Sequence, residues 1–343
     1  MSAAAGAGRG DGPGAGAGPG GRTRRLGVIG SFVWDVIHGR DVRQAPVEEW
    51  GGITYALSAC DAALPDDWAL VPLAKVGHDR IVEARRFLRT LRRLAPDAEP
   101  IEVPQQNNQV TLRYHSDERR TEVLSGGVPP WTWAGLQPLL RDLDALYVNL
   151  ISGFELDLAT AQLLRQHFKG PIYCDLHSLV LAVEANGLRT YRPLAEVAAW
   201  CACFDILQVN EDELAMLAPD GLALAAVATG AGVRNLLVTL GRRGVVYFAE
   251  AGFDRLDDLR RPRRPGAGPL RTARVPASEA RVPGPGDPTG CGDVWGATYF
   301  SRLLAGDIME VALRRAMDAA ARNVEHRGAT GLSNHLRGEL HTP

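Results

Sequence analysis

The sequence predicts an α/β protein with a largely parallel central sheet and helices on both of its faces. Two observations support this prediction. Short apolar runs typical of buried strands alternate with stretches of helical period along most of the chain, and such alternation is characteristic of βαβ units. Residues 101–124 break the pattern, because their β-branched residues and short polar turns favour antiparallel strands, which we expect to stand apart as a lid.

The expected elements follow one another along the chain. Residues 26–29 form a buried strand that ends at a turn of small residues, and the glycine pair at 51–52 opens the first helix. The basic stretch 78–94 has the spacing of an amphipathic helix. Further strands are expected at 68–77, 145–151, 171–176, 204–210, 235–241 and 244–249, and further helices at 157–168, 211–218, 222–231, 291–306 and 308–328. Residues 252–286 are rich in Pro and Arg and show little pattern until 272–277.

The domain organisation predicted from composition is one body with two tails. Residues 1–25 are almost all Gly, Ala, Pro and Arg, so they cannot bury enough surface to offset chain entropy, and we expect a disordered, solvated tail. The folded domain is expected over residues 26–335, with the lid built from about 37–47 and 101–124. Residues 336–343 are expected to be a C-terminal tail.

Composition excludes several classes of protein. The chain has 343 residues and is 45% hydrophobic, so it can form a full hydrophobic core. Its formal net charge of −2 creates no overall electrostatic attraction to nucleic acid or to an anionic membrane. Five scattered cysteines indicate reduced thiols and a cytoplasmic protein. No apolar run is long enough to span a bilayer.

The glycine-rich stretch GPGDPTGCGD leads directly into a predicted helix. If residues 290–293 form the first turn of that helix, their backbone N–H groups lack intrahelical partners and can bind an anion at the positive end of the helix dipole. A carboxylate beside that anion, Asp293, is suited to accept a proton from an attacking hydroxyl. The alternative is that Asp287 or Thr289 simply caps the helix. The GVIGS turn after the first strand lacks the full G-x-G-x-x-G pattern, and the Walker pattern G-x-x-x-x-G-K-[ST] is absent.

Several motifs together resemble one known family. The stretch GDPTGCGDVWGA is similar to the D-[TP]-[TV]-G-[AC]-G-D signature of the ribokinase-like, PfkB-type carbohydrate kinases. Five further stretches match motifs of that family in the same order, between residue 26 and about residue 332: VIGSFVWDVI, GGITYALSA, LAKVGHDR, VNEDELAML and LLVTLGRRGVVYF, with AARNVEHRGA resembling the last helix. The resemblance implies a three-layer ribokinase-like fold with a small β lid.

The resemblance also implies an activity: transfer of phosphate from ATP to an alcohol group of a sugar-like acceptor. Asp293 would be the general base, and the N–H groups of Gly290, Cys291 and Gly292 would form an anion hole for the transferred phosphoryl group. Asn210 and Glu213 would order Mg²⁺ and its waters, although an acidic helix start is the plainer interpretation of this NEDE stretch. A monovalent cation and a homodimer formed through the lid stay open expectations.

The remaining site residues divide between nucleotide and acceptor. Asp35 follows the first strand, where it would grip sugar hydroxyls or merely stabilise a turn. The resemblance places Thr239, Gly241, Asp287, Thr289 and Asn323 around the nucleotide, and Asp35, Gly51, Gly52, Tyr55 and Asp175 around the acceptor. The glycines would let backbone approach the substrate or allow tight helix packing, and Asn323 would equally suit a surface helix position.

Two departures from the family pattern bear on the substrate. Many members carry an asparagine in GGxxxN, where this chain has Ala56 after Tyr55, so ribose is expected to be a poor acceptor. Asp175 and His177 stand where the family often carries DxNxR, and a contact of either with substrate or phosphate stays open beside plain loop structure. The rival functions are a nucleoside kinase on the same fold and a catalytically weak nucleotide- or sugar-binding sensor.

Overall fold

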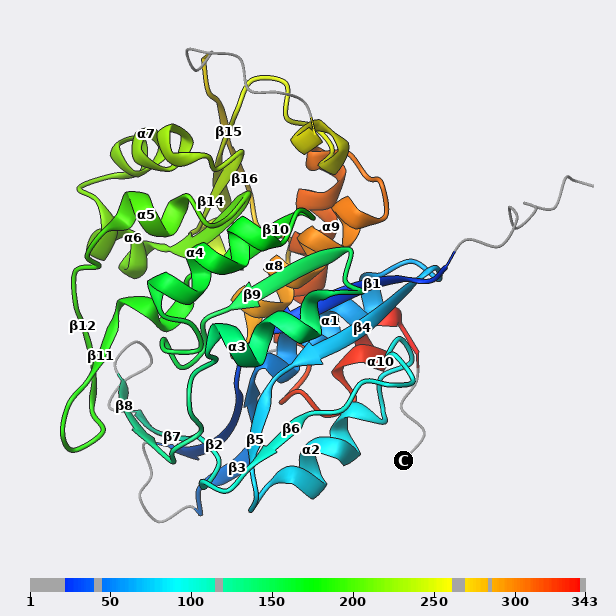
Figure 1. Ribbon diagram of the computed structural model, residues 1–343, viewed down its shortest axis with the longest axis vertical. Helices are drawn as coiled ribbons and strands as arrows, with labels where there is room; N and C mark the ends of the chain where they lie inside the picture. The colour runs from blue at the N-terminus through cyan, green and yellow to red at the C-terminus, as the bar shows by residue number, and fades with distance from the viewer. Residues whose placement is uncertain (1–21, 40–44, 115–119, 261–268, 283–285, 340–343) are drawn as a thin grey trace, which may run out of the picture.

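The main sheet lies at the centre of the computed structural model, which describes residues 22–39, 45–114, 120–260, 269–282 and 286–339 (Figure 1). Its eight strands run in the order β16-β15-β14-β13-β10-β9-β1-β4. Pairs from β4 to β14 are parallel, while β14, β15 and β16 pair antiparallel. The bounds are β1 Arg24–Ile29, β4 Trp68–Leu73, β9 Ala145–Asn149, β10 Ile172–Asp175, β13 Ile206–Asn210, β14 Asn235–Thr239, β15 Val245–Ala249 and β16 Arg271–Val275.

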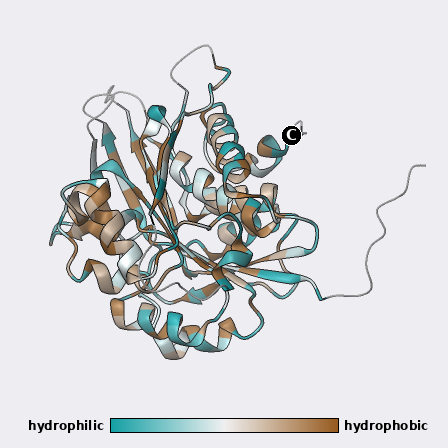
Figure 2. Ribbon diagram, turned by 90° about the horizontal axis from the view of Figure 1, so that it is seen from above, coloured by the Kyte–Doolittle hydropathy of each residue, from teal (hydrophilic) through white to brown (hydrophobic). Residues whose placement is uncertain are grey.

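Helices cover both faces of this sheet, because successive strand residues point to opposite sides and both sides are apolar. Val28 packs in the core with the helices α1, α8, α9 and α10, whereas its neighbour Ile29 packs in a second core with α4, α5 and α7. The first set spans Ile53–Ala63, Cys291–Leu304, Met309–Val324 and Leu332–Arg337, and the second Leu158–His167, Val197–Cys201 and Gly221–Ala231. Figure 2 shows the apolar segments concentrated at the centre. The three-layer α/β fold is confirmed.

The lid is a separate four-stranded sheet of order β3-β2-β7-β8, seen at the lower end of Figure 1. Its strands are β2 Phe32–His38, β3 Val47–Gly52, β7 Gln109–Tyr114 and β8 Arg120–Ser125. The expected lid included residues 101–103, but this segment, β6 (Ile101–Val103), pairs instead with β5 (Lys75–Gly77) in a small parallel sheet. β2 and β7 are also parallel, not antiparallel, and the segment from β3 to β6 between them in sequence supplies the long crossover that a parallel pair needs.

A short hairpin that the sequence did not predict extends the lid. Its strands, β11 Leu181–Val183 and β12 Arg189–Tyr191, pair antiparallel. The turn between them reaches β8, where the Leu124 N–H donates to the Gly187 carbonyl at 2.8 Å. Gly187 has φ +82°, and a Cβ there would lie 2.3 Å from the Leu124 oxygen, so only glycine permits this approach.

One predicted helix is shorter than expected. α2 spans Ile81–Leu88, not residues 78–94, because the Thr90 and Leu91 N–H groups turn back to the carbonyls of Phe87 and Leu88. The chain then follows the edge strand β4, with the Leu70 N–H donating to the Arg93 carbonyl at 2.6 Å. The remaining short helices are α3 Trp133–Leu136 and α6 Glu211–Leu217.

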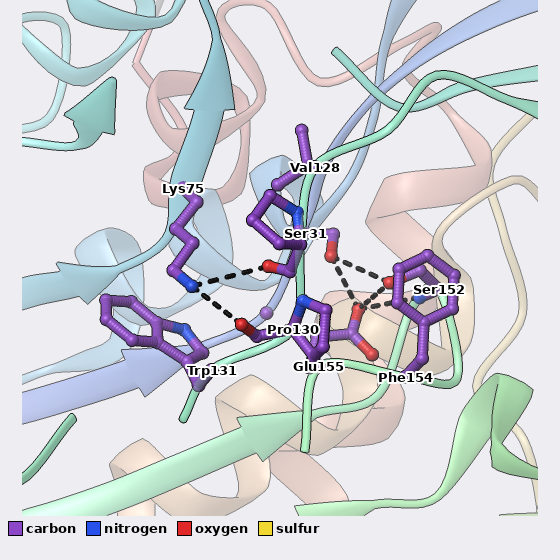
Figure 3. Close-up of a pocket in the computed structure, with 10 residues that line it drawn as sticks. Ser31, Lys75, Val128, Pro130, Trp131, Ser152, Phe154 and Glu155 are labelled. Carbon is purple, nitrogen blue, oxygen red and sulfur yellow. Dashed lines mark hydrogen bonds between the residues drawn. The ribbon is translucent and has the colours of Figure 1, made fainter. Parts of the chain in front are cut away.

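Hydrogen bonds of one buried carboxylate hold the base of the lid (Figure 3). Glu155 accepts from the Ser31 hydroxyl at 2.7 Å and from the Ser152 N–H at 2.6 Å, which joins the β1–β2 corner to the segment after β9. Beside it, Lys75 donates to the Pro130 carbonyl at 2.7 Å and lies over the Trp131 ring. The cavity between them is about 10 Å³, room for one water, so this is a structural joint and not a ligand site.

Both expected tails overlap ordered structure. β1 begins at Arg24, and Arg22 forms an ion pair with Asp144 at 2.6 Å, so the body starts before residue 26; residues 1–21 lie outside the described residues. At the other end, α10 runs to Arg337, whose guanidinium meets the fully buried Asp61 carboxylate at 2.6 Å. Within the described ranges no single helix is long and apolar enough to cross a membrane; α6 and α7 qualify only as a pair bent by 67°.

We predict that Arg337→Ala lowers the free energy of unfolding by about 3 kcal/mol, because it leaves the buried Asp61 carboxylate without its cation. Urea denaturation followed by circular dichroism measures this change. Arg141→Ala, at an exposed surface arginine, is the control and should shift the unfolding free energy by no more than about 0.5 kcal/mol. Equal stability of the two variants would show that the pair of Arg337 with Asp61 does not stabilise the fold.

Candidate functional site

A cavity of about 760 Å³ lies between the lid, the carboxyl ends of the main-sheet strands and the N-terminus of α8. This is the edge at which open α/β sheets bind ligands. It brings together most residues that the sequence singled out. The expected residues that line it are Asp35, Gly52, Tyr55, Asp175, Asn210, Glu213, Thr239, Gly241, Thr289, Gly290, Cys291, Gly292 and Asp293.

The glycine loop forms the N-terminus of α8, as the motif predicts. Gly290 is the N-cap residue in the left-handed conformation, with φ +73°. Among the described residues, no hydrogen bond occupies the N–H groups of Gly290 and Gly292, but the Cys291 N–H donates to the Pro288 carbonyl at 3.1 Å. The anion hole expected from three N–H groups therefore rests on two of them, because Cys291 closes the turn that precedes the helix.

Asp293 lies in the first turn of α8, buried at the bottom of the cavity. Asn149, the last residue of β9, donates its side-chain N–H to Asp293 Oδ1 at 2.6 Å and so fixes the carboxylate. Burial raises the pKa of Asp293, and the nearby His177 and the Asn149 hydrogen bond act in the opposite direction. A buried, oriented carboxylate with a raised pKa is suited to general-base chemistry.

A glutamine that sequence analysis missed connects the sheet to the glycine loop. Gln208 on β13 donates from one side-chain nitrogen to Asp175 Oδ2 at 2.9 Å and to the Gly292 carbonyl at 3.2 Å, and its oxygen accepts from the Tyr173 hydroxyl. Gly296 makes room for this network, since a Cβ there would lie 2.3 Å from the Gln208 oxygen. Nothing in the sequence separates Gln208 from an ordinary strand residue.

Asn210 and Glu213 form a capping box at the start of α6. The Glu213 N–H donates to Asn210 Oδ1 at 2.9 Å, and the Asn210 N–H donates to Glu213 Oε2 at 2.8 Å. Burial and the charge of Asp293 raise the pKa of Glu213 to about 8. Asp175 nearby has a pKa well above its ordinary value, through burial and the charges of Glu213 and Asp293. Three carboxylates thus crowd one end of the cavity.

The acceptor-side residues depend on close backbone approach. Asp35 on β2 lies against Gly51, where a Cβ would be 1.8 Å from Asp35 Oδ2. Gly52 has φ +60°, and a Cβ there would lie 2.6 Å from the Ser31 carbonyl. Tyr55 packs its ring on the Gly290 backbone, because a Cβ at Gly290 would be 2.2 Å from Tyr55 Cδ1. Burial raises the pKa of the Tyr55 phenol.

Three expected site residues do not line the cavity: Gly51, Asp287 and Asn323. Asp287 accepts from the Thr289 N–H at 2.9 Å within the loop itself, and it does not cap α8, whose N-cap residue is Gly290 without a side-chain capping bond. Asn323 is buried behind the loop and donates to the Thr289 carbonyl at 2.8 Å. Asp287 and Asn323 therefore brace the glycine loop. Residues of the cavity wall that the sequence did not single out include Glu122, Arg189 and Tyr191.

Part of the chain is similar to a family of kinases. The model of the pfkB family carbohydrate kinase matches residues 182–335. No curated protein matches the chain. A nucleoside kinase of Burkholderia thailandensis in complex with inosine superposes with a TM-score of 0.67 at 16% identity, over 90% of this chain and 94% of that one.

Two further structures show the same fold. A pyrophosphate-dependent kinase of the ribokinase family, complexed with a pyrophosphate analog and myo-inositol, gives a TM-score of 0.67 at 16% identity, over 88% of this chain and 96% of that chain. Arabidopsis thaliana ribokinase, complexed with ribose and ATP, gives a TM-score of 0.63 at 15% identity, over 92% of this chain and 99% of that chain. The fold is therefore ribokinase-like. Together with the family match, it confirms the resemblance to PfkB-type carbohydrate kinases that the motifs carry.

Proposed function

We propose that the protein is an ATP-dependent kinase that transfers phosphate to an alcohol group of a sugar or sugar-like molecule. One observation carries this proposal: the oriented carboxylate of Asp293 lies beside the N–H groups that begin α8, at the bottom of a cavity large enough for both substrates. A base next to an anion-binding helix end is what phosphoryl transfer to a hydroxyl requires. A binding protein without catalysis would gain nothing from the base.

In the proposed mechanism, the oxygen of the acceptor hydroxyl attacks the γ-phosphorus of ATP and Asp293 accepts the hydroxyl proton. The bond from the γ-phosphorus to the bridging oxygen breaks, and ADP leaves. The N–H groups of Gly290 and Gly292, with the positive end of the α8 dipole, stabilise the charge on the transferred phosphoryl oxygens. Asn149 holds the carboxylate in place throughout. Thr239 and Gly241, at the end of β14, form the part of the cavity wall proposed for the nucleotide.

Magnesium fits this site through its waters. The described residues contain no group of three or more acidic, His or Cys side chains that could hold a metal ion directly. However, the crowded carboxylates of Asp175, Glu213 and Asp293 have raised pKa values, so a divalent cation nearby would relieve their repulsion. Mg²⁺ keeps several waters and takes oxygen ligands. We propose that Asn210 and Glu213 hold those waters while the donor phosphates bind the ion, which neutralises phosphate charge.

The side chains that line the cavity indicate the chemical class of the acceptor. Tyr55 lines the cavity together with Val33, Val110 and Leu112 of the lid, which offers an aromatic and aliphatic wall where the family's asparagine would offer a hydrogen bond. An apolar ring face suits this wall better than a row of hydroxyls. Ribose is therefore proposed as a poor acceptor, and a nucleoside kinase is the second candidate that the wall favours.

Pairing of two lids is proposed as the route to a homodimer, because a four-stranded sheet has a second face to cover. Part of that outer face is already covered within the chain. Phe32 meets Phe87 of α2 at 6.2 Å between ring centroids, and the Arg80 guanidinium lies 4.2 Å from the Trp34 ring. A partner would therefore cover the part that α2 leaves open.

We predict that Asp293→Asn lowers kcat by about two to four orders of magnitude, because it removes the base but keeps the size and most hydrogen bonds of the side chain. ATP turnover is measured against a panel of sugars, polyols and nucleosides, and nucleotide affinity by calorimetry. The affinity should stay within about threefold of the wild-type value. Normal turnover in this variant would remove Asp293 from the mechanism.

Gly51→Ala should raise the KM for the acceptor at least about tenfold while the KM for ATP stays within about twofold. The new methyl group would occupy the space of the Asp35 carboxylate, 1.8 Å away, and so displace the grip on the acceptor. Gly230→Ala is the matched control, because a Cβ there meets nothing within 4 Å. If both variants keep the wild-type KM for the acceptor, Asp35 does not bind it.

Magnesium should stabilise the protein more at pH 8 than at pH 6. Glu213 has its pKa raised from 4.5 to about 8, so the folded state keeps a proton that the unfolded chain releases, and stability falls as pH rises through that window. A cation favours the ionised form and opposes this loss. Melting temperatures with ADP are compared with and without Mg²⁺ at both pH values. An equal shift at both, or an unchanged pH dependence in Glu213→Gln, would contradict the prediction.

A further inference from the structure

The β11–β12 hairpin supplies one wall of the acceptor half of the cavity. Leu181, Arg189 and Tyr191 of this hairpin line the cavity opposite the lid. The hairpin turn is joined to the lid strand β8 by the hydrogen bond between Leu124 and Gly187 and by a bridge between Val123 and Leu188. Figure 1 shows the hairpin descending beside β8. Hairpin and lid therefore enclose the acceptor together.

Arg189 is the cationic side chain of this enclosure. Its side chain is 4% exposed, and one terminal nitrogen donates to the Ile151 carbonyl at 3.0 Å. The other terminal nitrogen lies 3.7 Å from Glu122 Oε2 on β8, longer than a good hydrogen bond. The Ile151 carbonyl and the Glu122 carboxylate thus hold the guanidinium in place. Arg189 also lines the cavity between the hairpin and the lid.

The charged side chains of this half of the cavity leave it with a net negative charge. Its charged side chains among the described residues are Asp35, Glu122 and Arg189, two carboxylates and one guanidinium, so their sum is −1. The carboxylates of Asp175 and Asp293 lie at the bottom of the same cavity. The other wall is aliphatic, formed by Val33, Val110, Leu112 and Ile151. A ligand in this space meets an apolar surface on one side and a polar edge of net negative charge on the other.

We propose that Arg189 is a specificity-determining residue for the acceptor, and that its pairing with Glu122 selects a neutral acceptor and excludes an anionic one. This inference rests on the proposed kinase function, since it concerns the acceptor half of the same cavity. The guanidinium donates to oxygens of the acceptor while Glu122 neutralises it, so a neutral molecule gains hydrogen bonds without breaking the pair.

An anionic acceptor faces a different balance. To bind Arg189 it must separate the guanidinium from Glu122 and leave that carboxylate beside a second negative charge in a buried site. Asp35 and Asp293 add repulsion. Like-charge juxtaposition is a means by which binding sites reject the wrong partner. The same geometry predicts that removing the charge of Glu122 frees Arg189 for an anion.

The test measures binding by calorimetry in the presence of ADP and Mg²⁺, so it does not depend on turnover. Glucose and glucuronate are the matched probes, because they share a ring and differ by a carboxylate; myo-inositol and inosine are further neutral probes. The wild type should bind at least one neutral probe and bind glucose more tightly than glucuronate. Arg189→Met should weaken the bound neutral probe about ten- to a hundredfold. Arg192→Met, at an exposed position of the same hairpin, should change nothing.

Glu122→Gln provides the decisive comparison, because the proposal predicts that this variant gains affinity for the anionic probe. The ratio of glucuronate to glucose affinity should rise about tenfold or more, and Arg189→Met combined with Glu122→Gln should abolish that gain. Wild-type preference for glucuronate, no binding of any probe, or an unchanged ratio in Glu122→Gln would each overturn the proposal. Phosphate transfer is assayed separately. Binding with the expected charge preference but without transfer would contradict the kinase function and leave the role of Arg189 standing.

Discussion

The close packing of Tyr55 on the backbone of Gly290 fixes the start of α8, on which the site depends. The left-handed φ of +73° and the 2.2 Å distance from a notional Cβ to the Tyr55 ring allow only glycine at this position. Because α1 carries Tyr55 and α8 carries Asp293, the contact locks the two helices at their N-termini. It thereby sets where the helix dipole points and where the base lies relative to the anion hole.

Crowded carboxylates give the site its chemical character. Asp175, Glu213 and Asp293 lie close together at the ends of different elements, and burial raises the pKa of each. Such repulsion costs stability in the protein without its ligands and is relieved when cationic charge enters, so the cluster favours a phosphate donor that brings its own cation. The hydrogen bonds of Asn149 and Gln208 hold two of these carboxylates in place. The unfavourable interaction at Asp293 is therefore charge repulsion and not a strained backbone.

The sequence predicted those parts of the protein that are specified locally. The glycine loop and the acidic helix start after Asn210 are short motifs whose residues lie close together in sequence, so the pattern alone indicated where each helix begins. The partners of Asp293 and Asp175 were missed because Asn149 and Gln208 lie on apolar strands and act across the fold. The hairpin at 181–191 was missed because three-residue strands carry no period and are stabilised by a distant strand, β8. α2 ends early for the same reason: the edge of β4 competes for its last residues.

These two kinds of element divide the work of the site. The half that would act on phosphate is built from the ends of the main sheet and from helix N-termini, whose positions the layered core determines. The half that would recognise the acceptor is built from the lid and the hairpin, short strands held by a few hydrogen bonds and a small apolar cluster around Val110. Side chains of these strands that face the cavity, such as Val110 and Leu112, lie in this small cluster and outside the two cores of the main sheet. Acceptor choice therefore lies where tertiary contacts, and not local patterns, decide the structure, and a motif search can identify the reaction while leaving the substrate open.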